Sequence, residues 1–309
     1  MTMEYASFDE ILRSAGALSS SRMAVAAAGD PHTLEAALLA RRRGIADPVL
    51  TGDRSTIVSL LEEIGESVPD RDIIDAPDPA QAAAAAVALV REGRASFLLK
   101  GHMDTSVLLK AVVDRDKGLG RGRLMSHFTV FEVPGYHKLL APVDGGMVPY
   151  PTLEQKKQII ENTVEMFLAL GYERPKVGVL ACVEKLNPKM PETVEADALK
   201  QMWVRGEIRD CVVEGPISYD CAVSREIAEY KGFESPCAGD CDILLAPNIH
   251  AGNIMGKMLT VTCGAKMAGF IVGAACPIAM TSRGSSTDEK FYSIVLSALC
   301  ADGMKRPEA

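Results

Sequence analysis

The sequence of 309 residues contains no long hydrophobic run. A membrane-spanning helix needs roughly 18 consecutive apolar residues, and no segment approaches that length. The first residues lack the basic start and the apolar stretch of a secretory signal. We therefore expect a cytoplasmic protein that does not act in a membrane.

No C-x-x-C pair occurs among the eight cysteines, which all lie from Cys182 onward. Without such pairs or an export signal, free thiols in a reducing compartment are expected. Cys237, Cys241 and His250 could imitate half of a zinc site, but their spacing does not match the usual ligand patterns. We expect no bound metal.

Positive charge is not in excess, because 33 Lys and Arg face 41 Asp and Glu, which gives a net charge of −8. A general nucleic-acid binder would be expected to be basic, so that class is disfavoured. The sequence also has no Walker P-loop, no G-x-S-x-G elbow, no H-E-x-x-H pair and no dinucleotide fingerprint. An anionic small substrate remains compatible, since it needs only a few local donors and cations.

Strand-like and helix-like segments alternate along most of the chain. Strands are predicted at 23–28, 48–52, 96–100, 128–133, 139–143, 177–183, 211–213, 243–246, 270–272 and 277–280. Helices are predicted at 33–43, 56–64, 79–91, 105–112, from 152 with a capping box, 193–203, 248–258 and 287–299. This alternation favours an α/β fold with a mainly parallel sheet and helices on both faces.

Four polar segments follow predicted strands, where α/β folds bind their ligands. The first, 281–289, opens a helix and pairs a glycine turn with Arg283, which suits a phosphoryl group. Asp288 and Glu289 stand near enough to act as a base. The alternative for this segment is an ordinary Ser- and Thr-rich helix cap with Arg283 in a surface ion pair.

The other three segments are 100–106 with Lys110 beyond it, 215–220 and 247–253. The first could hold an anion through lysines and backbone amides, or be a solvated loop. The second is interpreted as a tight turn after a strand, with Asp220 as a ligand-binding or helix-capping carboxylate. In the third, His250 could be a base, a ligand or a structural residue.

Together these segments resemble the phosphate acetyl/butyryl transferase family. The most specific matches are GPISYDCAVS (215–224), SPCAGDCDILLAPNIHAGNIMGK (235–257) and TSRGSS (281–286). The segments at 98–112, 131–140, 153–164 and 184–193 are similar to the butyryl branch rather than the acetyl branch.

The resemblance implies two α/β domains of the isocitrate-dehydrogenase-like type with an interdomain active-site cleft. We place the domains at 1–143 plus 276–309, carrying the S-R-G motif, and at 144–275, on the coenzyme A side. It also implies a homo-oligomer, most simply a homodimer. The implied substrates are coenzyme A, acyl phosphate and inorganic phosphate, with no tightly bound cofactor.

Residue roles carried over from the family centre on Ser282 and Arg283, which would hold the thiol and the phosphate. The family's base falls at Glu289 here, with Asp288 as the alternative. Lys110 replaces an arginine and can supply charge but not a bidentate fork. The full set of predicted substrate-binding residues is Lys100, Thr105, Ser106, Lys110, Ser126, Gly215, Pro216, Asp220, His250, Gly252, Asn253, Gly284 and Ser285.

The predicted activity is reversible transfer of a short acyl group, butyryl favoured, between coenzyme A and inorganic phosphate by direct thiolate attack in a ternary complex. Two alternatives stay open at this point. One is a phosphate acetyltransferase, which differs only in its acyl pocket. The other is a catalytically silent coenzyme A-binding regulatory protein of the same fold.

Overall fold

The computed structural model describes residues 4–18, 20–280 and 286–305. The chain forms two compact units. We call Phe8–Arg123 with Ala268–Ala309 the terminal unit, and Met1–Ser7 with Leu124–Met267 the central unit. The sequence placed the boundaries at 143/144 and 275/276, whereas the compact units meet at 123/124 and 267/268. The segment from Ala268 onward belongs to the same compact unit as the first strands.

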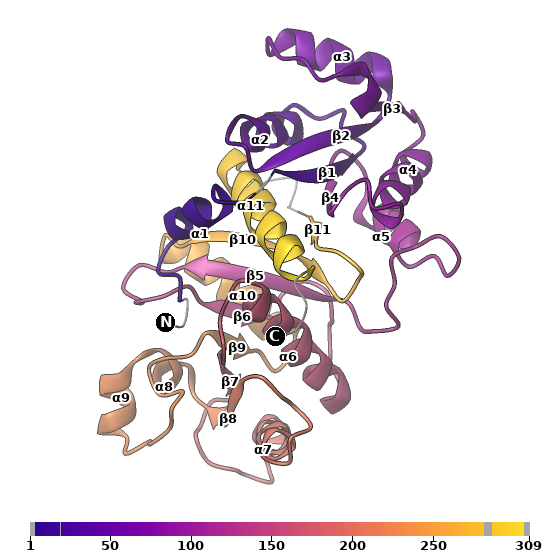
Figure 1. The fold of residues 1–309 in the computed structure, drawn as a ribbon. Coiled ribbons are helices and arrows are strands. Elements are labelled where there is room, and N and C mark those ends of the chain that lie inside the picture. The colour runs from indigo at the N-terminus through magenta and orange to yellow at the C-terminus, as the bar shows by residue number, and fades with distance from the viewer. Residues whose placement is uncertain (1–3, 19, 281–285, 306–309) are drawn as a thin grey trace. The chain divides into compact units, whose positions relative to one another are not determined.

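The terminal unit is built on parallel strands (Figure 1). Its strands run in the order β3-β2-β1-β4-β11-β10, and all neighbours are parallel except β10 and β11. The strands are β1 (Ser21–Ala26), β2 (Ala46–Gly52), β3 (Ile73–Asp75), β4 (Phe97–Lys100), β10 (Lys266–Val272) and β11 (Ile278–Ala279). The helices are α1 (Phe8–Ala15), α2 (Pro31–Arg42), α3 (Arg54–Glu63), α4 (Pro79–Arg91), α5 (Thr105–Val112) and α11 (Thr287–Gly303), with a short 3₁₀ turn at Asp70–Asp72.

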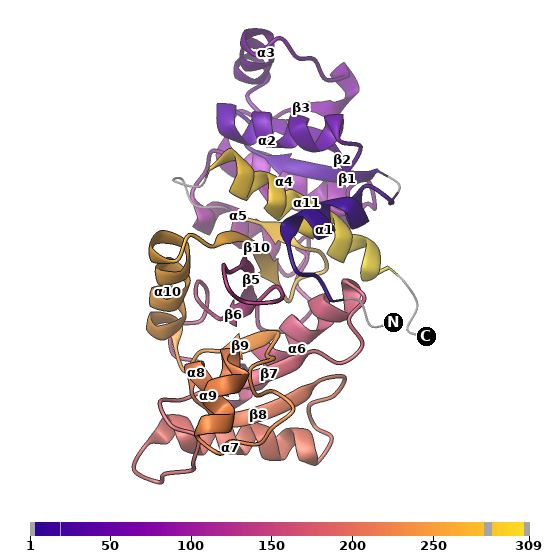
Figure 2. The same ribbon diagram turned by 90° about the vertical axis from the view of Figure 1, so that its left-hand side faces the viewer.

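Helices cover both faces of this sheet. Figure 2 shows α1, α2 and α11 on the near face, with α4 and α5 behind the strands. All four residues of β4 are buried, as are the last four of β1. Strands buried on both faces become continuous apolar runs, which is why the sequence reveals them so clearly.

Local sequence explains where the helices begin. Asp30 caps α2 by accepting a hydrogen bond from Thr33 N, and Asp78 caps α4 through Ala80 N and Gln81 N. Both helices then start with proline, whose missing N–H costs nothing in the first turn. The prediction of a helix at Pro79–Arg91 is confirmed.

The central unit holds a second parallel sheet, of order β6-β9-β7-β8. The strands of this sheet are β6 (Ala141–Val143), β7 (Lys176–Leu180), β8 (Val212–Ile217) and β9 (Ile243–Leu245), and the central unit also contains β5 (Ser126–Glu132), which is not part of this sheet. Its helices are α6 (Leu153–Ala169), α7 (Pro191–Val204), α8 (Tyr219–Val223), α9 (Arg225–Tyr230) and α10 (Ile249–Lys257), followed by a π-helical turn at Met258–Thr262. The capping box predicted at the start of α6 is confirmed, with Thr152 and Gln155 bonding reciprocally.

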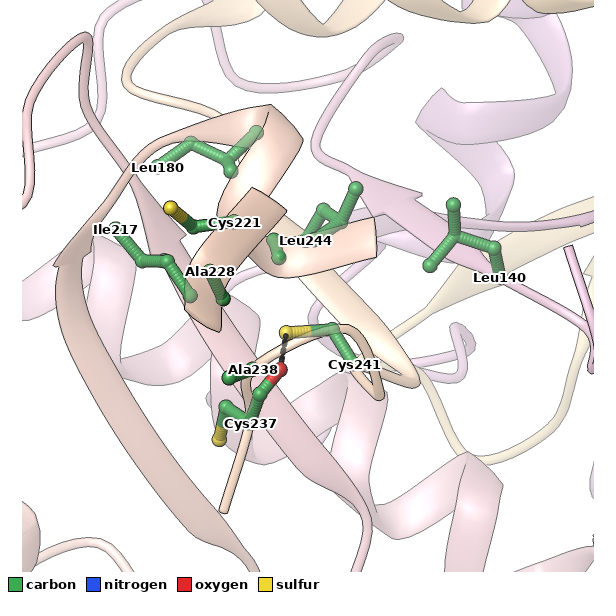
Figure 3. Packing of buried hydrophobic residues seen from close by; sticks show 10 residues of the cluster. Leu140, Leu180, Ile217, Cys221, Ala228, Cys237, Ala238, Cys241 and Leu244 are labelled. Atoms are coloured by element: carbon green, nitrogen blue, oxygen red, sulfur yellow. Dashed lines mark hydrogen bonds between the residues drawn. The ribbon is translucent and has the colours of Figure 1, made fainter. Parts of the chain in front are cut away.

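Strand ends and short helices share one core cluster in the central unit (Figure 3). Leu180, Ile217 and Leu244 from the sheet pack with Cys221 of α8 and Ala228 of α9. This packing fixes α8 and α9 beside the carboxyl ends of β7 and β8.

Cys237 and Cys241 belong to the same cluster, where Cys241 Sγ donates to Cys237 O at 3.3 Å. All eight cysteines are free thiols.

One predicted turn is in fact a strand. The sequence pattern predicts that residues 215–217 follow a strand, but Gly215 and Pro216 lie inside β8. Proline is tolerated there because β8 is the edge of the sheet, where a missing N–H breaks no ladder. Glycine is required because a Cβ at position 215 would lie 2.8 Å from Val179 Cβ.

Within the described ranges, no helix is both long and apolar enough to cross a bilayer.

Candidate functional site

A cavity of about 460 Å³ lies at the carboxyl ends of β1 and β4 in the terminal unit. Its walls are Asp30, His32, Pro79, Lys100, Gly101, His102, Met103, Asp104, Val107 and Lys290. A second cavity of about 500 Å³ lies at the opposite ends of these strands, beside Ser21 and Ser96. Because open α/β sheets bind ligands at their carboxyl ends, the first cavity is the candidate substrate site.

Lys100 ends β4 and is 8% exposed. Its ammonium group donates to Met103 O at 2.8 Å and to Gly101 O at 3.2 Å. Gly101 is needed because a Cβ there would lie 2.2 Å from Ala27 O. Lys100 therefore folds the 101–103 loop around its own charge and holds that loop against the end of β1.

Helix N-termini converge on the same cavity. Asp30, Pro79 and Asp104 stand at the starts of α2, α4 and α5, and all three line it. The Asp104 side chain makes no capping hydrogen bond to α5. The positive end of a helix favours an anion at this point.

The first turn of α11 supplies a second lysine to the cavity. Lys290 is 6% exposed and lines the cavity together with Asp30. Burial would raise the pKa of Asp30, but the two hydrogen bonds from Thr33 outweigh it and the charge of Lys290 adds a smaller lowering, so the pKa of Asp30 lies below its ordinary value. The cavity thus contains two ammonium groups and at least one ionised carboxylate.

The two predicted base candidates lie in the same turn. Asp288 is exposed and Glu289 is partly buried. Glu289 N donates to Ser286 Oγ, which caps α11. The predicted residues Ser282, Arg283, Gly284 and Ser285 lie outside the described residues, immediately before this helix.

Three further predicted residues lie on α5. Thr105 and Ser106 occupy its first turn and Lys110 its last, and all three are exposed. Thr105 directly follows the cavity-lining Asp104, whereas Lys110 lies more than one turn beyond it.

The central unit has a charged cluster at the carboxyl ends of β7 and β8. Lys231 Nζ lies 2.9 Å from Glu184 Oε1 and 2.8 Å from Asp220 Oδ2. Ser218 Oγ contacts both carboxylates, at 2.5 Å for Asp220 Oδ1. One lysine therefore bridges two carboxylates and offsets part of their mutual repulsion.

These contacts set the titration of the cluster. The pKa of Asp220 falls to about 2, chiefly through its hydrogen bond with Lys231 and then through Ser218. The pKa of Glu184 is lowered by the Ser218 hydroxyl first and by Lys231 second. Both groups are charged at neutral pH. Glu184, Asp220 and Cys221 form the one set of metal-ligand type found among the described residues, and Lys231 already pairs with its two carboxylates.

A second central-unit site joins the loops after β6 and β9. The Asp144 carboxylate accepts hydrogen bonds from the backbone N–H groups of His127, Gly146 and Met147. Gly252 packs so closely that a Cβ there would lie 2.5 Å from Asp144 O.

Asn253 and His250 complete this junction. Asn253 Nδ2 donates to Gly145 O at 3.0 Å, and the His250 ring lies 2.9 Å from the Tyr150 hydroxyl at an exposed position. Residues 251–253 thus link the segment after β9 to the loop after β6.

The remaining predicted residues are buried. Ser126 is 1% exposed and accepts a hydrogen bond from Asn162 Nδ2 at 3.1 Å, inside the central unit. Gly215 and Pro216 are buried within β8. The predicted set therefore separates into a terminal-unit group around Lys100 and two central-unit groups, around Asp220 and around Gly252.

Residues 74–298 match the model of the phosphate acetyl/butaryl transferase family. The chain belongs to this family. A phosphate butyryltransferase of Clostridium acetobutylicum is 42% identical over 295 residues, which cover 96% of this chain and 98% of that protein. A phosphate acetyltransferase of Thermotoga maritima is 43% identical over 91% of this chain and 95% of that protein.

A solved structure supports the same family assignment. A branched-chain phosphotransacylase from Enterococcus faecalis matches with a TM-score of 0.79 and 30% identity, over 91% of this chain and 99% of that one. Relatives named phosphate butyryltransferase and relatives named phosphate acetyltransferase therefore both align over nearly the whole chain.

Sequence reasoning missed three charged residues of these sites. Lys290, Glu184 and Lys231 stand in segments that look like ordinary helix or loop surface. Lys290 directly follows the two base candidates at the start of an apolar helix, and a charge at such a position is a usable signal. Glu184 and Lys231 are 47 residues apart, and their pairing depends on the fold.

Proposed function

We propose that this chain transfers a short acyl group reversibly between coenzyme A and inorganic phosphate, with butyryl favoured. The observation that carries the proposal is the terminal-unit cavity, where two lysines and the uncapped start of α5 meet at the carboxyl end of a parallel sheet. Such a site suits a phosphoryl group. Family membership supplies the reaction.

The reaction is direct acyl transfer without a covalent enzyme intermediate. A thiol has an ordinary pKa near 8.5, so only a few per cent is thiolate at pH 7. Glu289, or Asp288, takes the thiol proton, and the sulfur attacks the acyl carbonyl. The new C–S bond forms as the C–O bond to phosphate breaks, and phosphate leaves with the electron pair.

Ser282 and Arg283 have predicted roles at this step, orienting the sulfur and binding the phosphate. They precede α11, whose first turn carries both base candidates and Lys290. Charge that develops on the leaving phosphate is stabilised most effectively by preorganised donors. Residues 282–285 stand in the right sequence position to supply them.

The central unit is proposed to bind coenzyme A. The Asp220 cluster and the Gly252 loops stand at the carboxyl ends of its own parallel sheet, where such sheets take ligands.

We also propose a homo-oligomer. Ile254, Met258 and Val261 expose an apolar stripe along α10 and the turn after it, with Val261 84% exposed. Light scattering of the purified chain decides the oligomeric state.

Phosphate acetyltransferase is the second candidate, because the Thermotoga maritima relative so named is as similar as the butyryltransferase relative. One methylene in an apolar pocket changes selectivity by only about 1–3 kcal/mol. The deciding experiment follows thiol release from acetyl-, butyryl- and longer acyl-CoA, with and without inorganic phosphate. Phosphate-dependent release that peaks at butyryl supports the proposal, a peak at acetyl selects the second candidate, and no phosphate dependence leaves a coenzyme A-binding protein.

A further inference from the structure

The cavity of about 500 Å³ at the amino ends of β1 and β4, which we call the basal cavity, carries an excess of positive charge. Its walls contain four basic side chains, Arg22, Arg71, Arg94 and Lys305, and two acidic ones. The whole chain has the opposite balance, with a net charge of −8. The charge of this cavity therefore does not follow from the composition of the protein.

Three of the four cations have partners inside the terminal unit. Arg22 Nη2 lies 2.5 Å from Asp72 Oδ1. Arg94 forms an ion pair with a neighbouring glutamate at 3.3 Å, and both side chains of this pair are 57% exposed, so the pair is weak. Lys305 Nζ donates to the Ser96 hydroxyl at 2.8 Å, and that partner carries no charge. The charges of Arg94 and Lys305 are thus compensated little or not at all by these contacts.

Arg71 differs from the other three. It is exposed and lies in the short 3₁₀ turn that precedes β3. Within residues 4–18, 20–280 and 286–305 its side chain makes no hydrogen bond or ion pair. The carboxylates on either side of it in the sequence, Asp70 and Asp72, already pair with Arg54 and Arg22. The Arg71 guanidinium group therefore faces the cavity with all of its donors available.

Helix ends explain part of the positive charge but not all of it. Cations at a helix C-terminus offset the negative end of the helix dipole. Lys305 follows α11 and Arg94 follows α4, so both fit that role. Arg22 lies on β1, and Arg71 lies in a turn of three residues, which is too short to build up such a dipole. An adjoining cavity of about 210 Å³ is also lined by Arg22 and Arg71 and adds Arg41.

The other wall residues indicate which anion would fit. They include Ser20, Ser21 and Ser96, whose hydroxyl groups can donate hydrogen bonds. Among the described residues, no aromatic side chain lines the basal cavity, so a nucleobase would find no ring to stack on. Guanidinium groups match the geometry of phosphoryl oxygens and bind them through two parallel hydrogen bonds. This lining suits a compact phosphorylated anion.

We propose that the basal cavity binds a compact anion with two phosphoryl groups, held by Arg71 at one wall and by Lys305 and Arg94 at the other. Arg71 precedes β3, whereas Lys305 and Arg94 follow α11 and α4, so the cations reach the ligand from separate segments. The site is distinct from the candidate substrate cavity, which lies at the opposite ends of β1 and β4. It does not depend on the acyl-transfer reaction.

Calorimetric titration of the full chain with inorganic diphosphate tests the proposal. The compared proteins are the wild type, Arg71→Ala, Lys305→Met and Arg115→Ala. Arg115 is the matched control, because it is an exposed arginine of the same unit that lines neither the basal nor the adjoining cavity. Its replacement removes the same charge as Arg71→Ala. At about 0.1 M salt, where charges are screened beyond about 10 Å, a distant charge has little effect.

Arg71→Ala and Lys305→Met are each expected to weaken diphosphate binding by about three- to tenfold, the size of one exposed charge-assisted contact. Arg115→Ala should bind diphosphate like the wild type. Unchanged affinity in Arg71→Ala or in Lys305→Met would overturn the proposal, because diphosphate would then bind elsewhere, for example in the candidate substrate cavity. An equal loss in Arg115→Ala, or a wild type that does not bind diphosphate, would overturn it as well.

Discussion

Removing the charge of Lys138 should destabilise the central unit strongly. Lys138 Nζ lies 2.8 Å from Asp242 Oδ1 and 2.9 Å from Asp240 Oδ1. The side chains of Lys138 and Asp242 are each 2% exposed. Lys138→Met keeps most of the volume and leaves the Asp242 carboxylate buried without its cation. Breaking a buried pair in this way costs about 3–5 kcal/mol.

The loss of stability should depend on pH, and the pKa of Asp242 sets the direction of that dependence. Burial raises the pKa of Asp242, and Lys138 opposes that rise. Without Lys138 the pKa of Asp242 rises further, so the folded state binds a proton at pH values where the unfolded chain is ionised. Stability of the variant therefore increases as pH falls from 7 toward 4, and its deficit relative to the wild type shrinks.

Urea unfolding followed by tryptophan fluorescence measures this effect. Trp203 is the only tryptophan, and it lies in the central unit with Nε1 donating to Cys211 O at 2.9 Å. Lys185→Met, at an exposed position in the same unit, is the control. A deficit below about 1 kcal/mol at pH 7, the size typical of an exposed pair, would refute the reasoning, as would a larger deficit that does not change with pH.

Three further outcomes are expected. Gly101→Ala should lower both stability and turnover, because its Cβ would lie 2.2 Å from Ala27 O and overpacking costs about 1–3 kcal/mol. Urea unfolding and initial rates measure these two effects, and normal turnover would contradict the prediction. Glu289→Gln should slow acyl transfer by about 10²–10⁴-fold and more than Asp288→Asn, and the reverse ranking would move the base to Asp288. Lys231→Met should raise the pKa of Asp220 from about 2, and NMR titration of the carboxyl group measures that pKa. An unchanged pKa would show that Lys231 is not the main reason why the pKa of Asp220 is low.

Much of the fold is predictable because its signals are local. The helix at Pro79–Arg91 combines alanine-rich sequence with an Asp cap and a proline start, so propensity and capping agree. The capping box at Thr152 is equally local. The buried strands β1 and β4 stand out because both of their faces are apolar.

Other elements depend on tertiary context. Gly215 and Pro216 have the composition of a turn, and only the edge position of β8 and the close approach of Val179 make them strand residues. The short helices α8 and α9 are held by packing around Cys221 and were not predicted. Intrinsic propensity cannot reveal helices of five or six residues.

The candidate site also contains residues that could be predicted from the sequence and residues whose role depends on the fold. Lys100 and Asp104 follow a clear strand, so their place at the carboxyl end of β4 could be predicted. The sequence places Lys290 beside the base candidates, but its burial could not be predicted because it arises from the packing of α11. Lys231 could not either, since its pairing with Glu184 and Asp220 joins three separate segments.

The most direct test of the account is a crystal structure grown with inorganic phosphate or a slowly reacting acyl phosphate. The account predicts phosphoryl density inside the terminal-unit cavity at the carboxyl ends of β1 and β4. Phosphoryl density bound elsewhere on the chain, with water alone in this cavity, would contradict it.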